Sequence, residues 1–134
     1  MDELTLKIVT PDRVFYEGPI KSILTRGVEG DFMILKNHSP FVTVIQISEM
    51  KINFLDGNSR LAAIAGGYLT VKDNEVVIMS DACEWADEID IERAERAKAR
   101  AERRISDKLT DDEVLQAEIA LKRALNRLDV YKHK

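Results

Sequence analysis

Cysteine and histidine are scarce in this chain of 134 residues. It contains one cysteine, Cys83, and two histidines, His38 and His133. A single cysteine excludes an internal disulfide, and so few Cys and His side chains exclude a Cys/His zinc site. Cys83 is therefore expected to be a small apolar residue at the end of a strand.

The sequence also lacks a long apolar run. No stretch of about 18 residues is uninterrupted by polar or charged side chains. The first residues include Asp2 and Glu3, whereas a signal peptide begins with basic residues. We therefore expect a chain that neither spans a membrane nor is exported, and that stays in the cytoplasm.

There is no excess of basic residues either. The formal net charge is -4; residues 1–84 carry all of it, and residues 85–134 are balanced. Affinity for nucleic acid depends on the release of counterions to a basic surface. This balance argues against non-specific binding of nucleic acid.

Residues 1–84 contain many short β patterns separated by turn signals. Asp56-Gly57-Asn58 is a strong hairpin signal because these residues tolerate a positive φ, and Gly66-Gly67 is expected to form a turn at a strand end. The expected strands cover residues 4–8, 14–16, 20–24, 32–35, 41–45, 50–54, 61–65, 68–71 and 76–79. Short strands at this spacing predict an antiparallel β-sandwich or flattened barrel.

The period becomes helical after Glu84. Apolar residues then recur at spacings of three and four, which places them on one narrow seam of a helix. These residues are Ala94, Ala97, Ala101 and Ile105, and the arginines along one flank of the seam are Arg93, Arg96, Arg100 and Arg103. We therefore divide the chain into a β-sandwich domain at residues 1–84 and a helical hairpin at residues 85–134.

A second helix is predicted to begin after Thr110. Thr110 and Glu113 form a capping-box signature, in which hydroxyl and carboxylate each satisfy a backbone N–H. The same apolar spacing continues through Val114, Ala117, Leu121, Ala124 and Leu128. A turn near residues 106–109 would pair the two helices antiparallel. Because alanines bury little surface, the pair should be marginally stable alone and able to open.

The arginines of the second helix, Arg123 and Arg127, occupy the same relative flank as those of the first. In an antiparallel pair the two rows converge on one groove. Clustered cations destabilise a fold unless an anion lies between them, and the guanidinium fork matches phosphate oxygens. The groove therefore predicts a polyphosphate or a carboxylate-rich surface. The alternative is that the arginines are solvated positions supported by glutamates such as Glu92.

Catalytic patterns are weak. His38 and Ser39 with Asp31 suggest a hydrolytic triad, but no nucleophile-elbow glycines surround the serine. Gly66-Gly67 lacks the Lys-Ser/Thr and the helix that complete a phosphate loop. We expect no catalytic site and no catalytic cofactor.

Several short motifs occur in the order and spacing of a known family. They are Thr10-Pro11 with Glu17-Gly18, residues 30–35 running into His38-Ser39-Pro40, Gly66-Gly67-Tyr68-Leu69, and residues 89–94. Through these motifs the chain resembles the ε subunit of bacterial F-type ATP synthases over essentially its whole length.

The resemblance implies a non-catalytic rotor part. In that family the sandwich attaches to the γ subunit at the foot of the central stalk and rests on the ring of c subunits. The protein is then peripheral, at the cytoplasmic face of the cell membrane. The helices either fold down on the sandwich or extend toward the catalytic α and β subunits, where they restrain ATP hydrolysis in an enzyme that couples catalysis to proton transport.

The resemblance also implies a regulatory ligand, because some members bind ATP in the folded hairpin through a pattern of Ile or Leu, Asp, two free positions, Arg and Ala. This chain carries the pattern as Ile89, Asp90, Arg93 and Ala94, and the positions that match the other contacts are Glu84, Arg100, Arg123 and Arg127. ATP is a polyphosphate, which is one of the two ligand classes predicted for the groove between the arginine rows. Asp90 has a second interpretation as a helix N-cap, and both roles are compatible. Whether Mg²⁺ accompanies the nucleotide stays open.

Three functions remain to be separated: a regulatory rotor subunit, a free-standing ATP-sensing module and a small enzyme. A rotor subunit needs an exposed apolar contact surface on the sandwich, which a free sensor does not need. The enzyme hypothesis has no residues to support it.

Overall fold

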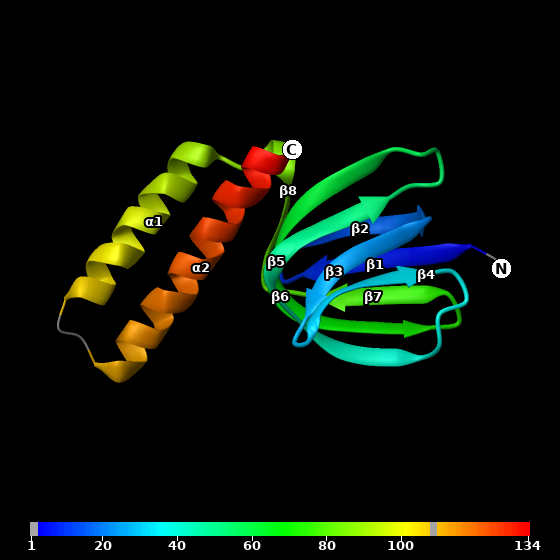
Figure 1. The fold of residues 1–134 in the computed structure, drawn as a ribbon, viewed down its shortest axis with the longest axis horizontal. Coiled ribbons are helices and arrows are strands. Elements are labelled where there is room, and N and C mark those ends of the chain that lie inside the picture. The colour runs from blue at the N-terminus through cyan, green and yellow to red at the C-terminus, as the bar shows by residue number, and fades with distance from the viewer. Residues whose placement is uncertain (1–2, 108–109) are drawn as a thin grey trace.

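The computed structural model describes residues 3–107 and 110–134. Strands come first and helices follow (Figure 1). The strands are β1 (Leu4–Thr10), β2 (Arg13–Ile20), β3 (Ser22–Gly27), β4 (Gly30–Leu35), β5 (Phe41–Asn53), β6 (Ser59–Lys72), β7 (Glu75–Met79) and β8 (Cys83–Trp85). A short 3₁₀ helix, η1 (Ala86–Glu88), leads to α1 (Ile91–Ser106) and α2 (Asp111–His133). The predicted fold class, a β-sandwich followed by a two-helix hairpin, is confirmed.

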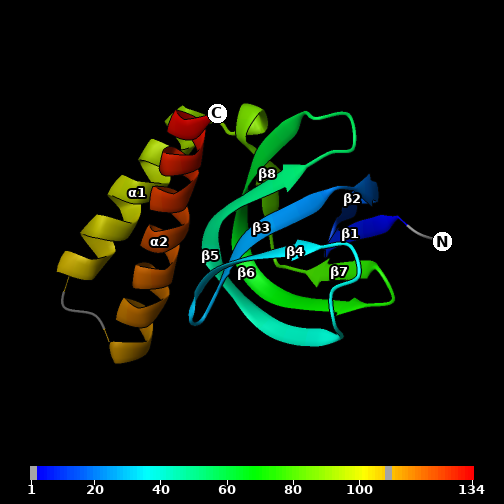
Figure 2. The same cartoon turned by 45° about the vertical axis from the view of Figure 1, so that its right-hand side comes forward.

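The strands form one curved sheet in the order β2-β1-β7-β6-β5-β3-β4, and β8 pairs with β6. Figure 2 shows how the long strands β5 and β6 curve so that the sheet folds over its own core. The side chains of Ile8, Ile23, Ile52 and Ile78 are completely buried there. The residues beside Ile8, Ile52 and Ile78 along their strands are less buried, as the period of a half-buried strand requires, whereas Ile23 directly follows the buried Ser22.

Two pairs of strands predicted as separate are in fact continuous. Residues 41–45 and 50–53 belong to β5, which ends one residue before the predicted Phe54, and residues 61–65 and 68–71 belong to β6. These two strands pair from Phe41 with Val71 to Asn53 with Ser59, so each partner supports the other along the whole length. The predicted hairpin at residues 56–58 joins them, and Gly57 has a φ of 92° there.

The glycine pair was wrongly predicted as a strand-end turn, because it lies inside β6. Gly67 has a φ of 139°, and a Cβ at this position would lie 2.1 Å from the carbonyl oxygen of Met79. Glycine is therefore required where β6 bends and β7 approaches its backbone. The strand pattern also does not finish at Met79, since β8 adds three residues that pair with β6.

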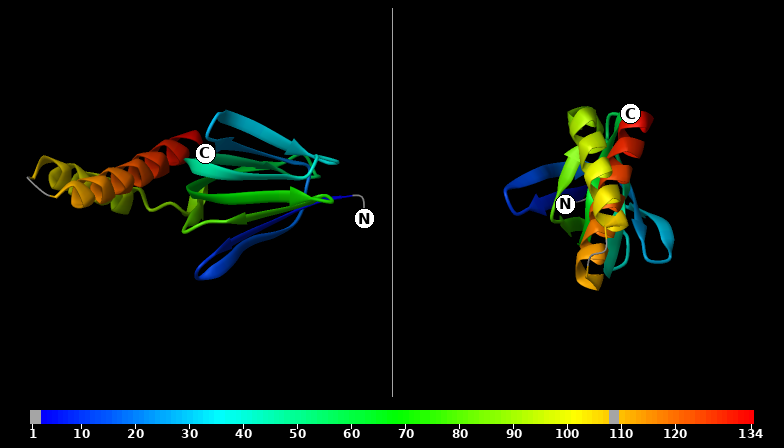
Figure 3. Two further views of the ribbon diagram at one scale, coloured as in Figure 1. Left: turned by 90° about the horizontal axis from the view of Figure 1, so that it is seen from below. Right: turned by 90° about the vertical axis from the view of Figure 1, so that its left-hand side faces the viewer.

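The two helices pack through the predicted alanine seam. Ala94 and Ala101 of α1 are buried, as are Ala117 and Ala124 of α2. Helix α2 lies between α1 and strands β5 and β6 (Figure 1). Figure 3 shows the hairpin projecting from one end of the sandwich, while the amino terminus lies at the other end. The expected turn near residues 106–109 includes residues 108 and 109, which lie outside the described part.

Both predicted helix starts are confirmed by hydrogen bonds. The carboxylate of Asp90 accepts from the backbone N–H of Arg93 at 3.1 Å, and the hydroxyl of Thr110 accepts from that of Glu113 at 3.3 Å. The Glu113 carboxylate accepts from the Thr110 hydroxyl at 3.0 Å instead of from its backbone. Within the described residues, the helices are too short or too polar to cross a membrane.

Candidate functional site

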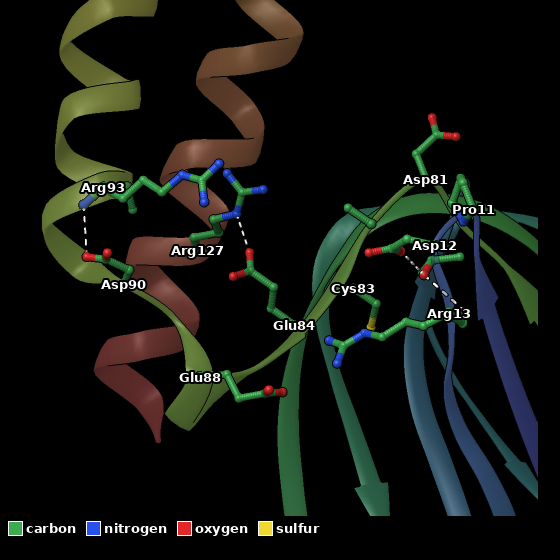
Figure 4. Close-up of a pocket in the computed structure, with 13 residues that line it drawn as sticks. Pro11, Asp12, Arg13, Asp81, Cys83, Glu84, Glu88, Asp90, Arg93 and Arg127 are labelled. Atoms are coloured by element: carbon green, nitrogen blue, oxygen red, sulfur yellow. Dashed lines mark hydrogen bonds and ion pairs between the residues drawn. The ribbon is translucent and has the colours of Figure 1, made fainter.

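A cleft of about 540 Å³ lies where the hairpin leaves the sandwich (Figure 4). The sandwich contributes residues 10–13 and 81–84 to its walls. Glu88 of η1, the first turn of α1 and one residue of α2, Arg127, contribute the rest. The cleft therefore lies between the two domains predicted from the sequence.

Strand pairing brings the sandwich residues of the cleft together. Strand β1 runs parallel to β7, with Val9 beside Met79, and the backbone N–H of Ser80 donates to the carbonyl of Val9 at 3.0 Å. Parallel neighbours end at the same edge of a sheet. The segments that follow β1 and β7, residues 11–13 and 81–84, consequently meet at one rim.

An ion pair ties this rim to the hairpin. The Nε of Arg127 donates to the Glu84 carboxylate at 2.6 Å, and each side chain is about one-third exposed, at 32% and 33%. The pair therefore joins α2 to β8. A guanidinium has five N–H donors, so the bond from Nε does not use those on the two terminal nitrogens of Arg127.

Five of the eight residues predicted to hold ATP line this cleft. They are Glu84, Asp90, Arg93, Ala94 and Arg127. Asp90 caps α1, so its interpretation as an N-cap is confirmed. Ala94 is 2% exposed and lies on the helix seam.

The other three predicted residues lie elsewhere. Ile89 is 5% exposed and packs with Ala63, Ala86 and Val130 in a small apolar cluster. Arg123 bonds Asp81 at 3.5 Å and lines, with Arg127, a groove of about 410 Å³ between the helices. Arg100 is exposed on α1 and lines neither the cleft nor that groove. The arginine rows thus meet at the cleft through Arg93 and Arg127 alone.

The β1–β2 turn contributes residues to the cleft that were not predicted from the sequence. Asp12 and Arg13 line the cleft, whereas the motif recognised in the sequence there was the preceding Thr10-Pro11. The Thr10 hydroxyl, which donates to Asp12 at 2.8 Å, the backbone N–H of Asp12 and the charge of Arg13 together lower the pKa of Asp12. This carboxyl therefore stays ionised at neutral pH.

The single cysteine lies at the floor of the cleft, where it is 5% exposed. Burial raises the pKa of Cys83 to about 12, although the nearby charge of Arg13 opposes the shift. The thiolate is the reactive form of cysteine, so this thiol is unreactive at neutral pH. Cys83 is the small apolar residue predicted from the sequence.

Two family models of known proteins match almost the whole chain. Residues 3–86 match the family model of the ATP synthase delta/epsilon chain β-sandwich domain, and residues 87–132 match that of the long α-helix domain. The chain belongs to the ATP synthase delta/epsilon chain family. The resemblance found in the sequence motifs is thereby confirmed.

Relatives in this family match the chain nearly from end to end. The ATP synthase epsilon chain of Caldicellulosiruptor bescii is 47% identical over 128 residues, which cover 96% of this chain and 93% of the relative. The epsilon chain of Exiguobacterium sp. is 41% identical and covers 97% of this chain and 96% of the relative.

Solved ATP synthases share the fold. A chain of the Euglena gracilis mitochondrial enzyme has a TM-score of 0.83 at 23% identity, covering 99% of this chain and 83% of its own length. A chain of the Tetrahymena thermophila mitochondrial enzyme has a TM-score of 0.67 at 18% identity, covering 96% of both. The two family domains meet at residues 86 and 87, within η1, so the cleft lies at their junction.

Proposed function

We propose that this chain is the non-catalytic ε subunit of an F-type ATP synthase and a rotor component of its central stalk. The sandwich would bind the γ subunit and the ring of c subunits, and the protein would be peripheral to the cytoplasmic face of the cell membrane. Family membership supports this role. The two structural neighbours come from assemblies described as F1 with a c-ring and as a central stalk with a c-ring.

An apolar row on the sandwich supports attachment to a partner protein. Five residues, one from each of β2, β1, β7, β6 and β5, are aligned across neighbouring strands: Val14, Val9, Met79, Tyr68 and Val44. Met79 is 59% exposed and Tyr68 is 63% exposed. Contiguous exposed apolar surface is typical of a protein contact. The alternative function, a free-standing ATP-sensing module, does not require it.

Copurification with γ tests this attachment. A double variant, Val44→Asp with Met79→Asp, places two charges in the apolar row and should abolish copurification, because burying an unpaired charge is costly. Leu55→Asp is the matched control, since Leu55 is 56% exposed in the turn between β5 and β6 and lies outside the row. Retention of γ by the double variant would contradict the proposed attachment.

The hairpin is proposed to regulate ATP hydrolysis by leaving the sandwich. Its docking contacts include buried Val130 and several polar contacts: besides the ion pairs of Arg127 and Arg123, the Asn126 amide donates to the carbonyl of Ser48 at 2.8 Å, and His133 contacts Glu49 at 2.6 Å. Once open, the helices would extend along γ to the catalytic α and β subunits. Their arginines would bind acidic segments there and restrain hydrolysis, a contact that salt weakens.

ATP is the proposed ligand of the closed hairpin. The observation that carries this proposal is the gathering of Glu84, Asp90, Arg93, Ala94 and Arg127 around one cleft. Guanidinium groups bind phosphate oxygens, and the two carboxylates accept from the adenine amine or the ribose hydroxyls. The cleft volume lies within the range of roughly 300–1,000 Å³ typical of small-molecule sites.

The remaining predicted ATP residues take supporting roles in this proposal. Ile89 fixes the position of Asp90, because its own side chain is buried beside Val130. Arg123 is adjacent to the cleft and would have to exchange Asp81 for a phosphate oxygen. Arg100 is left without a contact unless the ligand reaches beyond the cleft. Thermal unfolding at rising ATP concentrations, with and without Mg²⁺, tests the proposal, because a ligand of the closed state raises its melting temperature.

A further inference from the structure

The sandwich forms the wall of the cleft that lies opposite α1. Arg13, the first residue of β2, lines the cleft from this wall, and its side chain is directed toward the hairpin (Figure 4). The Thr10 hydroxyl donates to the carbonyl of Arg13 at 3.2 Å, and the guanidinium lies 5.2 Å from the centre of the Phe15 ring. The turn and the ring together hold Arg13 beside the cleft.

Each carboxylate of the cleft has at least one partner among its neighbours, although an ionised carboxylate keeps further acceptor sites. Asp81 and Glu84 pair with arginines of α2, Asp12 accepts from the Thr10 hydroxyl, and Asp90 caps α1. The remaining carboxylate, Glu88, accepts from the backbone N–H of Trp85 at 3.4 Å.

The arginines of the cleft are not equally satisfied. In the described part of the chain, Arg127 is paired with Glu84, but neither Arg13 nor Arg93 makes an ion pair. Arg13 belongs to the sandwich and Arg93 to the hairpin, so two unpaired guanidiniums line the same cleft from its two walls. An anionic group between them would compensate both charges, and phosphate oxygens match the guanidinium fork.

We propose that Arg13 is a further phosphate-binding residue, which acts with Arg93 and Arg127 and holds the nucleotide between the two domains. This inference rests on the proposed function, since it takes a nucleoside polyphosphate as the ligand. A nucleotide bound by the hairpin alone would stabilise only the helix pair. A nucleotide that also contacts Arg13 binds the docked state more tightly than the open one, and it therefore keeps the hairpin on the sandwich.

Calorimetric titration of the full chain with ATP, AMP and adenosine tests the role of Arg13. Arg13→Ala should weaken ATP binding about tenfold, as expected for the loss of one charge-assisted bond at an exposed site, and should leave adenosine binding unchanged. Arg13→Lys keeps the charge and should recover part of the affinity. Arg26→Ala is the control, because Arg26 pairs with Asp31 on the β3–β4 hairpin and lies outside the cleft.

The possible outcomes separate this inference from the function on which it rests. If Arg93→Ala weakens ATP binding and Arg13→Ala does not, the contact with Arg13 is refuted and the ATP site remains. Equal losses for ATP and adenosine, or equal losses in Arg13→Ala and Arg26→Ala, would also refute a phosphate contact. Failure of the unaltered chain to bind ATP would overturn both proposals. Fluorescence of Trp85, which lies in the sandwich core, verifies that each variant is folded.

Discussion

Val130 is a fully buried apolar residue of α2 at its contact with the sandwich, where Tyr131 of the same helix also packs. The Val130 side chain packs with Ala63, Ala86 and Ile89, whereas most of the other docking contacts are polar. Val130→Ala removes two methyl groups from this contact without touching the sandwich core or the alanine seam. We expect the variant to favour the open hairpin and to leave the sandwich intact.

The free-energy cost of Val130→Ala follows from the complete burial of the Val130 side chain. Two buried methyl groups contribute about 1.6 kcal/mol in transfer free energy, and the cavity left behind raises the cost to about 2 kcal/mol. At 25 °C a difference of about 2 kcal/mol changes the ratio of closed to open hairpin roughly thirtyfold. Leu125→Ala is the control on the same helix, because Leu125 is 39% exposed and its truncation should cost only a few tenths of a kcal/mol.

Fluorescence energy transfer measures this equilibrium. Dyes attached at two exposed positions, Glu29 in the β3–β4 turn and Glu102 on α1, report opening in a Cys83→Ala background during a urea titration. Val130→Ala should lower the urea midpoint of the transfer signal and leave the Trp85 fluorescence transition unchanged. Equal midpoints in Val130→Ala and Leu125→Ala would refute the assignment of Val130 as a docking contact.

Two further predictions concern the sandwich. Gly67→Ala should destabilise the sandwich by about 3 kcal/mol or more in chemical denaturation, because a Cβ would meet the Met79 carbonyl at 2.1 Å. Gly57→Ala is the control: Gly57 has a φ of 92° but open space around it, so this change should cost only about 1 kcal/mol. The raised pKa of Cys83 predicts that the sandwich loses stability at alkaline pH. The thiol of the unfolded chain ionises from about pH 9, whereas the folded thiol stays protonated to about pH 12. Between these values the free energy of unfolding should fall by about 1.4 kcal/mol per pH unit. Cys83→Ala should remove this slope, and an unchanged slope would assign it to other groups.

Features that depend on local sequence could be predicted. The two N-caps, Asp90 and Thr110, act on backbone groups three residues away, so the sequence contains all the information. The alanine seam follows from the helical period alone, since Ala94 and Ala117 lie at regularly spaced positions. The five predicted ATP residues in the cleft are close together because α1 begins there and Arg127 faces it from α2.

Features that depend on distant pairing could not be predicted. The parallel pairing of β1 with β7 joins residues about 70 positions apart, and together with the pairing of β8 to β6 it places Arg13 and Glu84 around one cleft. The continuity of β6 through Gly66-Gly67 was missed because a glycine pair usually interrupts a strand, whereas here the close approach of Met79 requires it. β8 is only three residues long, too short for a period to be recognised.

The ATP response of the closed hairpin tests the central claim most directly. With the dyes at positions 29 and 102, ATP at about one hundred times its Kd should stabilise the closed state by about 2.7 kcal/mol and raise the urea midpoint of opening. The variant Asp90→Ser with Arg93→Ala retains a helix cap but lacks a carboxylate acceptor and a phosphate donor, so it should lose this response. Arg104→Ala, an exposed arginine of α1 outside the cleft, should retain it. No ATP-dependent shift in the unaltered chain, or an equal shift in the double variant, would contradict a nucleotide site in the cleft.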